Sequence, residues 1–209
     1  MQLRPFLINH NLVTEEFPVA GVSSLEKATN GNTGNSVIGY SVARQIGVQE
    51  VSGIANVNGL DFGSIPEQEK DRVKEHHDVV ILMLQDHIRP NTDRYRFQQG
   101  LDYTGITRFL DRLALPVVMP SIGIQFHDMA LPDFINQLDP NLIQFLRDIA
   151  ERVPVIGVRG EITSDVLSRI GITSSRAIGC PSFFFQRPVR TRSFSPRRPR
   201  ATRKKKIGK

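Results

Sequence analysis

A single arginine in a glycine turn is the strongest candidate for chemistry in this chain. It lies in Gly157-Val158-Arg159-Gly160, after an apolar, β-branched run, Val153 to Val158, that has the length of a buried parallel strand. After the turn, apolar residues recur at helical spacing from Ile162 to Ile170, and Gly171 is placed to end that helix. The spacing therefore predicts that Arg159 lies where a strand becomes a helix.

A guanidinium at such a position is suited to binding an anion. In open α/β sheets, ligands bind outside the carboxyl ends of the strands, and a helix N-terminus there favours negative charge. Arginine can form paired hydrogen bonds with a carboxylate or a phosphate. The alternative is a structural role, in which Arg159 pairs with a nearby carboxylate such as Glu161.

A second candidate is the loop from Asn30 to Ser36, which is rich in turn residues and leads into an apolar helical pattern from Val37 to Ile46. It lacks the lysine of a phosphate-binding Walker loop and the spacing of a dinucleotide fingerprint. Backbone amides around Asn32, Gly34 and Asn35 could donate to a sugar or a phosphate. Equally, the asparagines and glycines could simply form the turn and cap the helix.

Two further loops are expected at the same edge, because each follows an apolar strand pattern. Gln85-Asp86-His87 ends one strand, and Gly123-Ile124-Gln125 belongs to the loop after another. The run Glu75 to Asp78 holds two histidines between acids, but adjacent side chains diverge on a helix. We therefore expect no metal site there.

Strand and helix patterns alternate along the chain, which predicts an α/β fold with a doubly wound parallel sheet and helices on both faces. Side-chain oxygens of Thr163, Ser164 and Asp165 are the expected caps of the helix after Arg159. A final buried strand is expected at Phe183-Phe184-Phe185. We expect at least five strands, including Val51–Val57, Val79–Leu84, Pro116–Met119 and Val155–Val158. The expected helices include Pro66–His76, Asp102–Leu115 and Asp139–Val153.

The charge is distributed unevenly along the 209 residues, which carry a formal net charge of +6. Residues 186–209 hold 11 Lys and Arg and no acid, which leaves 16 basic and 21 acidic residues, a net charge of −5, for the rest. We expect one folded domain over residues 1–185 and a basic, disordered tail after it. Nucleic-acid binding could therefore rest only on the tail.

The cysteine count and the hydropathy pattern bear on the redox compartment and on membrane insertion. One cysteine, Cys180, excludes an intramolecular disulfide framework and a multi-cysteine zinc site, which agrees with a reducing, cytoplasmic location. The N-terminus has no signal-peptide pattern, and the longest apolar run, Val79 to Leu84, is too short to span a bilayer. We therefore predict no transmembrane segment.

The residues around Arg159 also carry a family resemblance. The pattern from Ile156 to Ile172, IGVRGEITSDVLSRIGI, followed by Ile178-Gly179-Cys180-Pro181-Ser182, resembles the polysaccharide pyruvyl transferase family. The resemblance extends over Asn30 to Ser182. It implies a Rossmann-like fold similar to the first half of a glycosyltransferase B type enzyme, with the substrate site in the cleft between two such halves.

The family moves the enolpyruvyl group of phosphoenolpyruvate onto a sugar as a ketal. The resemblance thus implies a transferase of polysaccharide biosynthesis with a glycan acceptor, phosphoenolpyruvate as donor and no cofactor. It identifies no catalytic residue. Many members have glycines where this chain has Gln85-Asp86-His87, which is a departure from the family pattern. The substrate-binding residues implied are Asn32, Gly34, Asn35, Gly123, Gln125 and Arg159.

Two other interpretations stay open. The first is a catalytically incomplete domain whose basic tail, ending in Arg203-Lys204-Lys205-Lys206, binds nucleic acid or an anionic surface through counterion release. The second is that the tail replaces the family's second half through truncation or a frameshift, because composition changes abruptly near residue 186.

Overall fold

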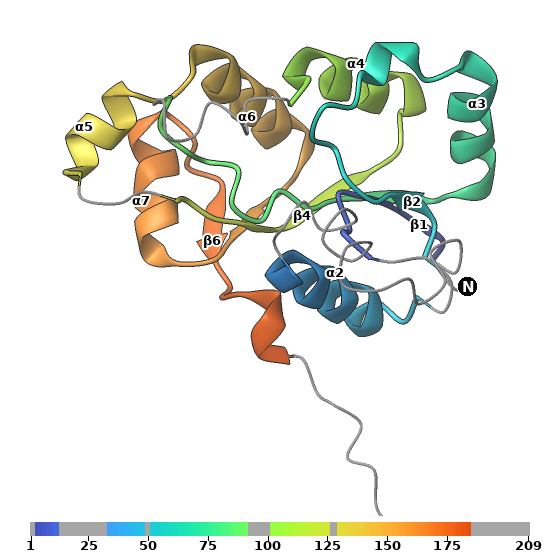
Figure 1. Cartoon of the computed structure of the whole chain (residues 1–209), viewed down its shortest axis with the longest axis horizontal. Coiled ribbons are helices and arrows are strands. Elements are labelled where there is room, and N and C mark those ends of the chain that lie inside the picture. The colour runs from blue at the N-terminus through green and yellow to red at the C-terminus, as the bar shows by residue number, and fades with distance from the viewer. Residues whose placement is uncertain (1–2, 13–32, 49–50, 92–100, 126–128, 185–209) are drawn as a thin grey trace, which may run out of the picture.

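The computed structural model describes residues 3–12, 33–48, 51–91, 101–125 and 129–184 of the chain. Its centre is a single sheet of six parallel strands (Figure 1). The spatial order is β2-β1-β3-β4-β5-β6. The strands are β1 Pro5–Ile8, β2 Gly53–Ile54, β3 Val79–Leu82, β4 Val117–Ile122, β5 Ile156–Val158 and β6 Ser175–Ala177.

The strand order reverses direction at β1. From β1 the chain first moves outward to β2, then returns across β1 to β3 and continues in one direction to β6. In open α/β sheets this reversal leaves a crevice at the carboxyl ends of the two strands that flank it, here β1 and β3. The topology therefore makes the segments after Ile8 and after Leu82 the candidate site for a ligand.

Helices connect the strands and cover both faces of the sheet. The helices are α2 Thr33–Gln45, α3 Glu67–His76, α4 Tyr103–Leu113, α5 Leu131–Asn136, α6 Pro140–Arg152 and α7 Glu161–Arg169, with short 3₁₀ turns η1 Phe62–Ser64 and η3 Pro181–Phe184. Local sequence explains several of these boundaries. In α6, Oδ1 of Asp139 accepts from the Asn141 amide at 2.8 Å, and Pro140 occupies the first turn, where its missing N–H is tolerated.

Alternate side chains of the central strands pack against different helices. Leu7 and Ile81 pack against Val42 in α2 on one face. Phe6 and Val80 belong to the larger core, which α3, α4, α6 and α7 cover on the other face. Figure 1 shows α2 on one side of the sheet and α3, α4 and α6 on the opposite side. The predicted α/β doubly wound parallel sheet is confirmed, and its architecture is Rossmann-like.

Three local predictions differ from the structure: two concern strands and one concerns the caps of a helix. β2 is two residues long rather than the predicted Val51–Val57, because it lies at the sheet edge and pairs only with β1. The predicted last strand is wrong, since Phe183 and Phe184 lie in the turn η3 with their side chains 83% and 58% exposed. Phe185 lies outside the described residues.

The predicted caps of α7 are also wrong. Gly160 is the N-cap residue and makes no side-chain capping bond. Thr163 is instead buried within the helix, and Oγ of Ser164 lies 2.8 Å from Oγ of Ser175 in β6. The hydroxyl of Ser164 therefore ties the helix to the neighbouring strand.

The part of the chain that the structure describes contains no helix both long and apolar enough to cross a bilayer.

Candidate functional site

Arg159 directly follows β5 and reaches across the ends of two other strands. Its Nη1 donates to the backbone carbonyl of Gln85, 74 residues away, at 3.3 Å. The side chain passes over Gly123, where a Cβ atom would lie 2.8 Å from Cδ of Arg159 and 2.9 Å from the Gln85 oxygen. The absence of a side chain at Gly123 therefore gives Arg159 its path, and the three residues meet at one edge of the sheet.

The guanidinium of Arg159 is available to a ligand. The residue is exposed, and it forms no ion pair with an acidic residue in the described ranges, Glu161 included. Its only described side-chain bond is the long one to Gln85, while its own amide donates to the Ile122 carbonyl at 2.9 Å. An exposed cation whose charge has no acidic partner can attract an anion without first breaking an ion pair.

Next to the Gln85 carbonyl that Arg159 reaches, two buried amide side chains join the segments after β1 and β3. Asn9 donates from Nδ2 to the Met83 carbonyl at 2.7 Å and to Oε1 of Gln85 at 3.0 Å. Gln85 returns a bond from Nε2 to the Asn9 carbonyl at 3.2 Å. Both residues are almost completely buried. Since every bond joins the two strands, the pair fixes the spacing of their carboxyl ends.

The segment after β1 continues this polar floor. Asn9 and Asn11 have φ angles of 65° and 52°, the left-handed region that asparagine tolerates better than most residues. Nδ2 of Asn11 donates to the Asn9 carbonyl at 2.8 Å, and Nδ1 of His10 accepts from the Leu12 amide at 3.0 Å. Burial lowers the pKa of His10 to about 4, so the ring is neutral and its proton lies on Nε2.

The first turn of α2 adjoins this segment. Oγ of Ser36 donates to the Asn11 carbonyl, and Gly39 packs so closely on the His10 carbonyl that a Cβ atom would clash with it. Gly34 and Asn35 therefore lie in the helix turn that contacts the switch-point segment. Asn32, the third predicted residue of this loop, lies outside the described residues.

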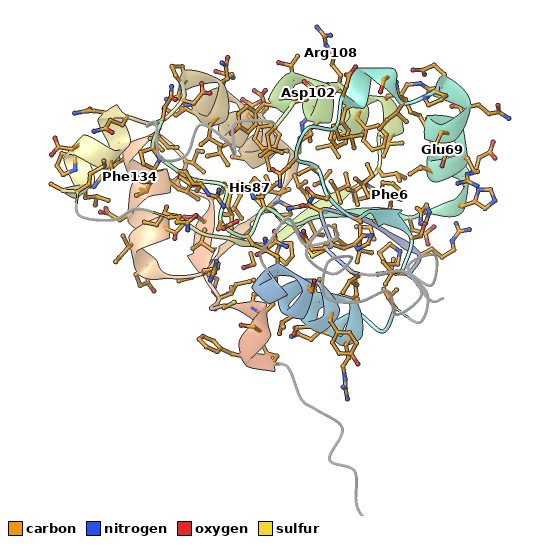
Figure 2. All side chains as sticks on the ribbon, viewed as in Figure 1. Phe6, Glu69, His87, Asp102, Arg108 and Phe134 are labelled. Atoms are coloured by element: carbon orange, nitrogen blue, oxygen red, sulfur yellow. The ribbon has the colours of Figure 1, made fainter. Side chains whose placement is uncertain are left out.

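Around the ends of β3 and β4, three buried polar atoms lack a hydrogen-bond partner in the described residues. Nδ1 of His87, Oγ of Ser121 and Oε1 of Gln125 form no hydrogen bond in the described part of the chain. The side chain of His87, labelled in Figure 2, is largely buried, and burial lowers its pKa to about 4, although Asp86 opposes this shift. Unpaired buried polar groups are rare in proteins, and bound water or ligand commonly satisfies them.

The sequence identified only part of this site. Gly123, Gln125 and Arg159 lie on adjoining strand ends, as expected from their positions after apolar strand patterns. Asn9, His10 and Asn11 were not predicted, because the first 30 residues have only a weak apolar pattern. A polar Asn-His-Asn triplet directly after the apolar Phe6 to Ile8 was the signal that could have located them. The chain matches no protein-family model, no curated protein and no solved structure.

Proposed function

We propose that this chain is a Rossmann-like domain of a polysaccharide pyruvyl transferase, in which Arg159 binds an anionic group of phosphoenolpyruvate. One observation carries the proposal. The motif that resembles the family, Ile156 to Ile172, contains Arg159. The Arg159 side chain reaches over Gly123 at the carboxyl edge of the sheet and has no acidic partner in the described ranges. Chemistry and resemblance thus indicate the same side chain.

The buried amides support the same location for the substrate. Gln85 departs from the family's glycines, but its side chain is buried against Asn9 rather than projecting over the edge. Its bulk therefore does not fill the space next to Gly123. Oγ of Ser121 and Oε1 of Gln125, on either side of that glycine in sequence, are buried without a hydrogen-bond partner in the described residues, as polar atoms next to a bound water or ligand commonly are.

The proposed reaction sets the role of the arginine. One sugar hydroxyl adds to the enol carbon of phosphoenolpyruvate while the methylene carbon takes up a proton and becomes a methyl group. A second hydroxyl of the sugar then displaces the phosphate, which leaves with its bonding electrons and takes the proton of that hydroxyl, and the ketal is complete. The donor's carboxylate and phosphate both carry negative charge throughout. A positioned guanidinium stabilises that charge and orients the donor. Arg159 supplies one such cation, and the proposed acceptor is a glycan.

Phosphoenolpyruvate binding tests this proposal directly. Calorimetric titration at low ionic strength should show saturable binding, and Arg159→Ala should weaken it roughly 10- to 100-fold, because a bond to a charged group contributes roughly 1.5–3 kcal/mol. Arg159→Lys should recover part of the affinity, since a point charge cannot form paired bonds. Thermal stability should change little, because the side chain is exposed.

Arg176→Ala is the matched control, since Arg176 is an exposed arginine on the neighbouring strand β6. It should bind phosphoenolpyruvate like the unmodified chain. Equal weakening in both variants would show a general charge effect and remove the specific role of Arg159. Absence of any saturable binding would contradict the proposed donor.

A further inference from the structure

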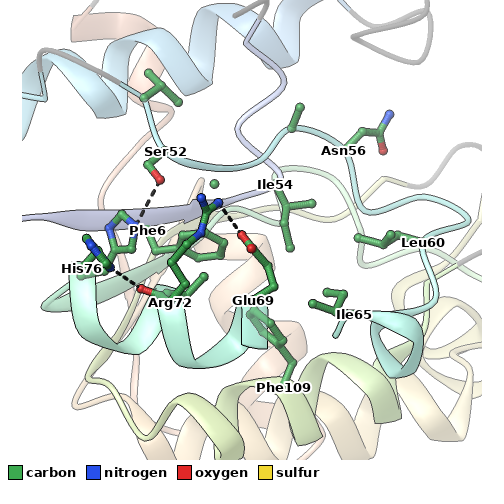
Figure 3. Close-up of a pocket in the computed structure, with 15 residues that line it drawn as sticks. Phe6, Ser52, Ile54, Asn56, Leu60, Ile65, Glu69, Arg72, His76 and Phe109 are labelled. Atoms are coloured by element: carbon green, nitrogen blue, oxygen red, sulfur yellow. Dashed lines mark hydrogen bonds and ion pairs between the residues drawn. The ribbon is translucent and has the colours of Figure 1, made fainter. Parts of the chain in front are cut away.

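A cavity lies away from the candidate site, between the edge strand β2 and helix α3. Its volume is about 1010 Å³, at the upper end of the range for ligand pockets. One wall is the continuous segment from Val51 to Asn56, which includes β2. The other wall is one face of α3, made by Glu69, Arg72, Val73 and His76 at helical spacing. Figure 3 shows these two walls facing each other across the groove.

The floor of the groove is apolar and rigid. Phe6 and Phe109 form it, with their ring centroids 6.2 Å apart, and both belong to the main core. Ile54, Leu60 and Ile65 are only partly buried and line the same cavity. An apolar side chain that entered the groove would therefore contact apolar surface and release water from it.

The strand wall carries backbone hydrogen-bonding groups that find no partner among the described residues. The carbonyls of Ser52 and Ile54 accept from Leu7 and Asn9 of the β1 segment at 2.9 and 2.7 Å. Successive residues of a strand present their backbone groups to opposite sides, so the N–H and C=O of Gly53 point away from β1. β2 is the last strand of the sheet on that side. In the described ranges no further strand pairs with this edge of the sheet, which borders the groove.

The charges of the groove define what it can accept. Residues 51–60 contain no charged side chain, whereas natural edge strands are commonly protected by lysine or other charges. The two fully charged lining residues neutralise each other, with Nη2 of Arg72 2.6 Å from Oε1 of Glu69. Burial lowers the pKa of His77, which keeps that lining residue neutral. A groove with no net charge complements an uncharged occupant and lacks the unpaired cations that nucleic acid requires.

We propose that this groove binds an extended, uncharged segment of a partner protein, which adds to β2 as a further strand of the sheet. Backbone bonds to Gly53 supply the pairing, and alternate apolar side chains of the segment enter the floor near Phe6 and Phe109. Six residues, 51–56, line the wall, which matches a partner segment of about six residues. The proposal is independent of the phosphoenolpyruvate site.

The test uses the full chain and three synthetic peptides. The parent is a fluorescein-labelled, terminally capped hexapeptide of alternating threonine and valine, and binding is measured by fluorescence anisotropy. One derivative is N-methylated on every valine amide and the other on every threonine amide. Only one set of alternate amides faces β2, so one derivative should bind at least 10-fold more weakly than the other. Equal affinity of all three peptides would indicate simple apolar adsorption and overturn the proposal, as would no binding of the parent.

Protein variants locate the binding surface. Ile65→Asp places a carboxylate in the groove and should weaken parent-peptide binding at least 10-fold. Ile162→Asp, at a 57% exposed position on α7, is the matched control and should bind normally. Unchanged affinity in a folded Ile65→Asp variant would overturn the proposed location, and the methylated peptides keep the test valid if that variant does not fold. A dimer of the unmodified chain that Ile65→Asp dissociates would instead identify a second copy as the occupant, which also overturns the proposal.

Discussion

The apolar core on the α3–α4–α6 face and the polar carboxyl edge are both buried, yet they are built from opposite chemistry. In the core, Phe109 packs against Phe62 in an edge-to-face contact with ring centroids 5.4 Å apart. At the edge, Asn9 and Gln85 satisfy each other, while neighbouring His87 and Ser121 keep unpaired polar atoms. Burying such groups does not stabilise a fold as apolar packing does. The difference indicates that the apolar core provides most of the stability, whereas the edge keeps buried polar groups that do not stabilise the fold in the same way.

Removing an aromatic ring from the core should have the largest effect on the free energy of unfolding. Phe109→Ala should lower the free energy of unfolding by roughly 3–5 kcal/mol, because it deletes a fully packed ring and leaves a cavity. Chemical denaturation monitored by circular dichroism measures the change. Phe183→Ala is the control, since that ring is 83% exposed, and its stability should stay within about 0.5 kcal/mol of the unmodified chain. Similar losses in both variants would show that the core is not where the structure places it.

Breaking the amide pair at the edge should lower the free energy of unfolding by less than removing Phe109 does. Gln85→Ala removes the acceptor for Nδ2 of Asn9 and the donor to the Asn9 carbonyl, and should destabilise the chain by roughly 1–3 kcal/mol. Gln144→Ala removes a comparable amide from the exposed face of α6 and should have almost no effect. If the Gln85 variant unfolds at the same denaturant concentration as the Gln144 variant, the buried pair does not support the switch point.

The third prediction concerns how the free energy of unfolding depends on pH, and it tests the polar edge. The pKa of buried His87 is about 4, below the ordinary 6.5, so the unfolded chain binds a proton more readily than the folded one. Its contribution is complete above pH 6.5 and is lost as pH falls towards 4, by up to about 1.4 kcal/mol per pH unit. His10 acts in the same window and direction, whereas the pKa of Asp78, held at about 2 by Arg4, affects stability only below pH 4.

His87→Gln should therefore make unfolding free energy less dependent on pH between 6.5 and 4, which denaturation at a series of pH values measures. His76→Gln changes an exposed histidine on α3 and should leave the slope unchanged. A slope that stays the same in the His87 variant would show that this ring is not buried in its neutral form.

The parts of the fold that sequence could predict are those with strong local signals. The helix α6 was predicted within one residue at each end, because Asp139, Pro140 and the apolar spacing of Leu142, Phe145 and Ile149 all agree. Strand β3 was likewise visible as a continuous apolar run. By contrast, β2 has two residues, and its length depends on a neighbour that lies 46 positions earlier in sequence.

The candidate site also contains some features that the sequence could predict and others that it could not. Arg159 and Gly123 follow recognisable strands, so their placement at the carboxyl edge could be predicted from pattern alone. The contact between them could not, because it depends on the register of β4 against β5, which contains an irregularity between Met119 and Ile122. Asn9 was missed since a buried asparagine has no periodic signature, and only its partner Gln85, 76 residues away, explains it.

The position of β1 has a consequence for how the chain folds. This strand comes first in sequence but lies inside the sheet, paired to β2 at Leu7↔Gly53 and to β3 at Pro5↔Val79. During synthesis it can pair with β2 only after Gly53 has been made and with β3 only after Val79 has been made, and pairings of such separation form slowly. The strands from β3 to β6 pair in sequence order and can assemble progressively. The Asn9–Gln85 bond joins the segment after β1 to the segment after β3, which is synthesised much later, so the polar edge can be completed only after that long-range pairing has formed.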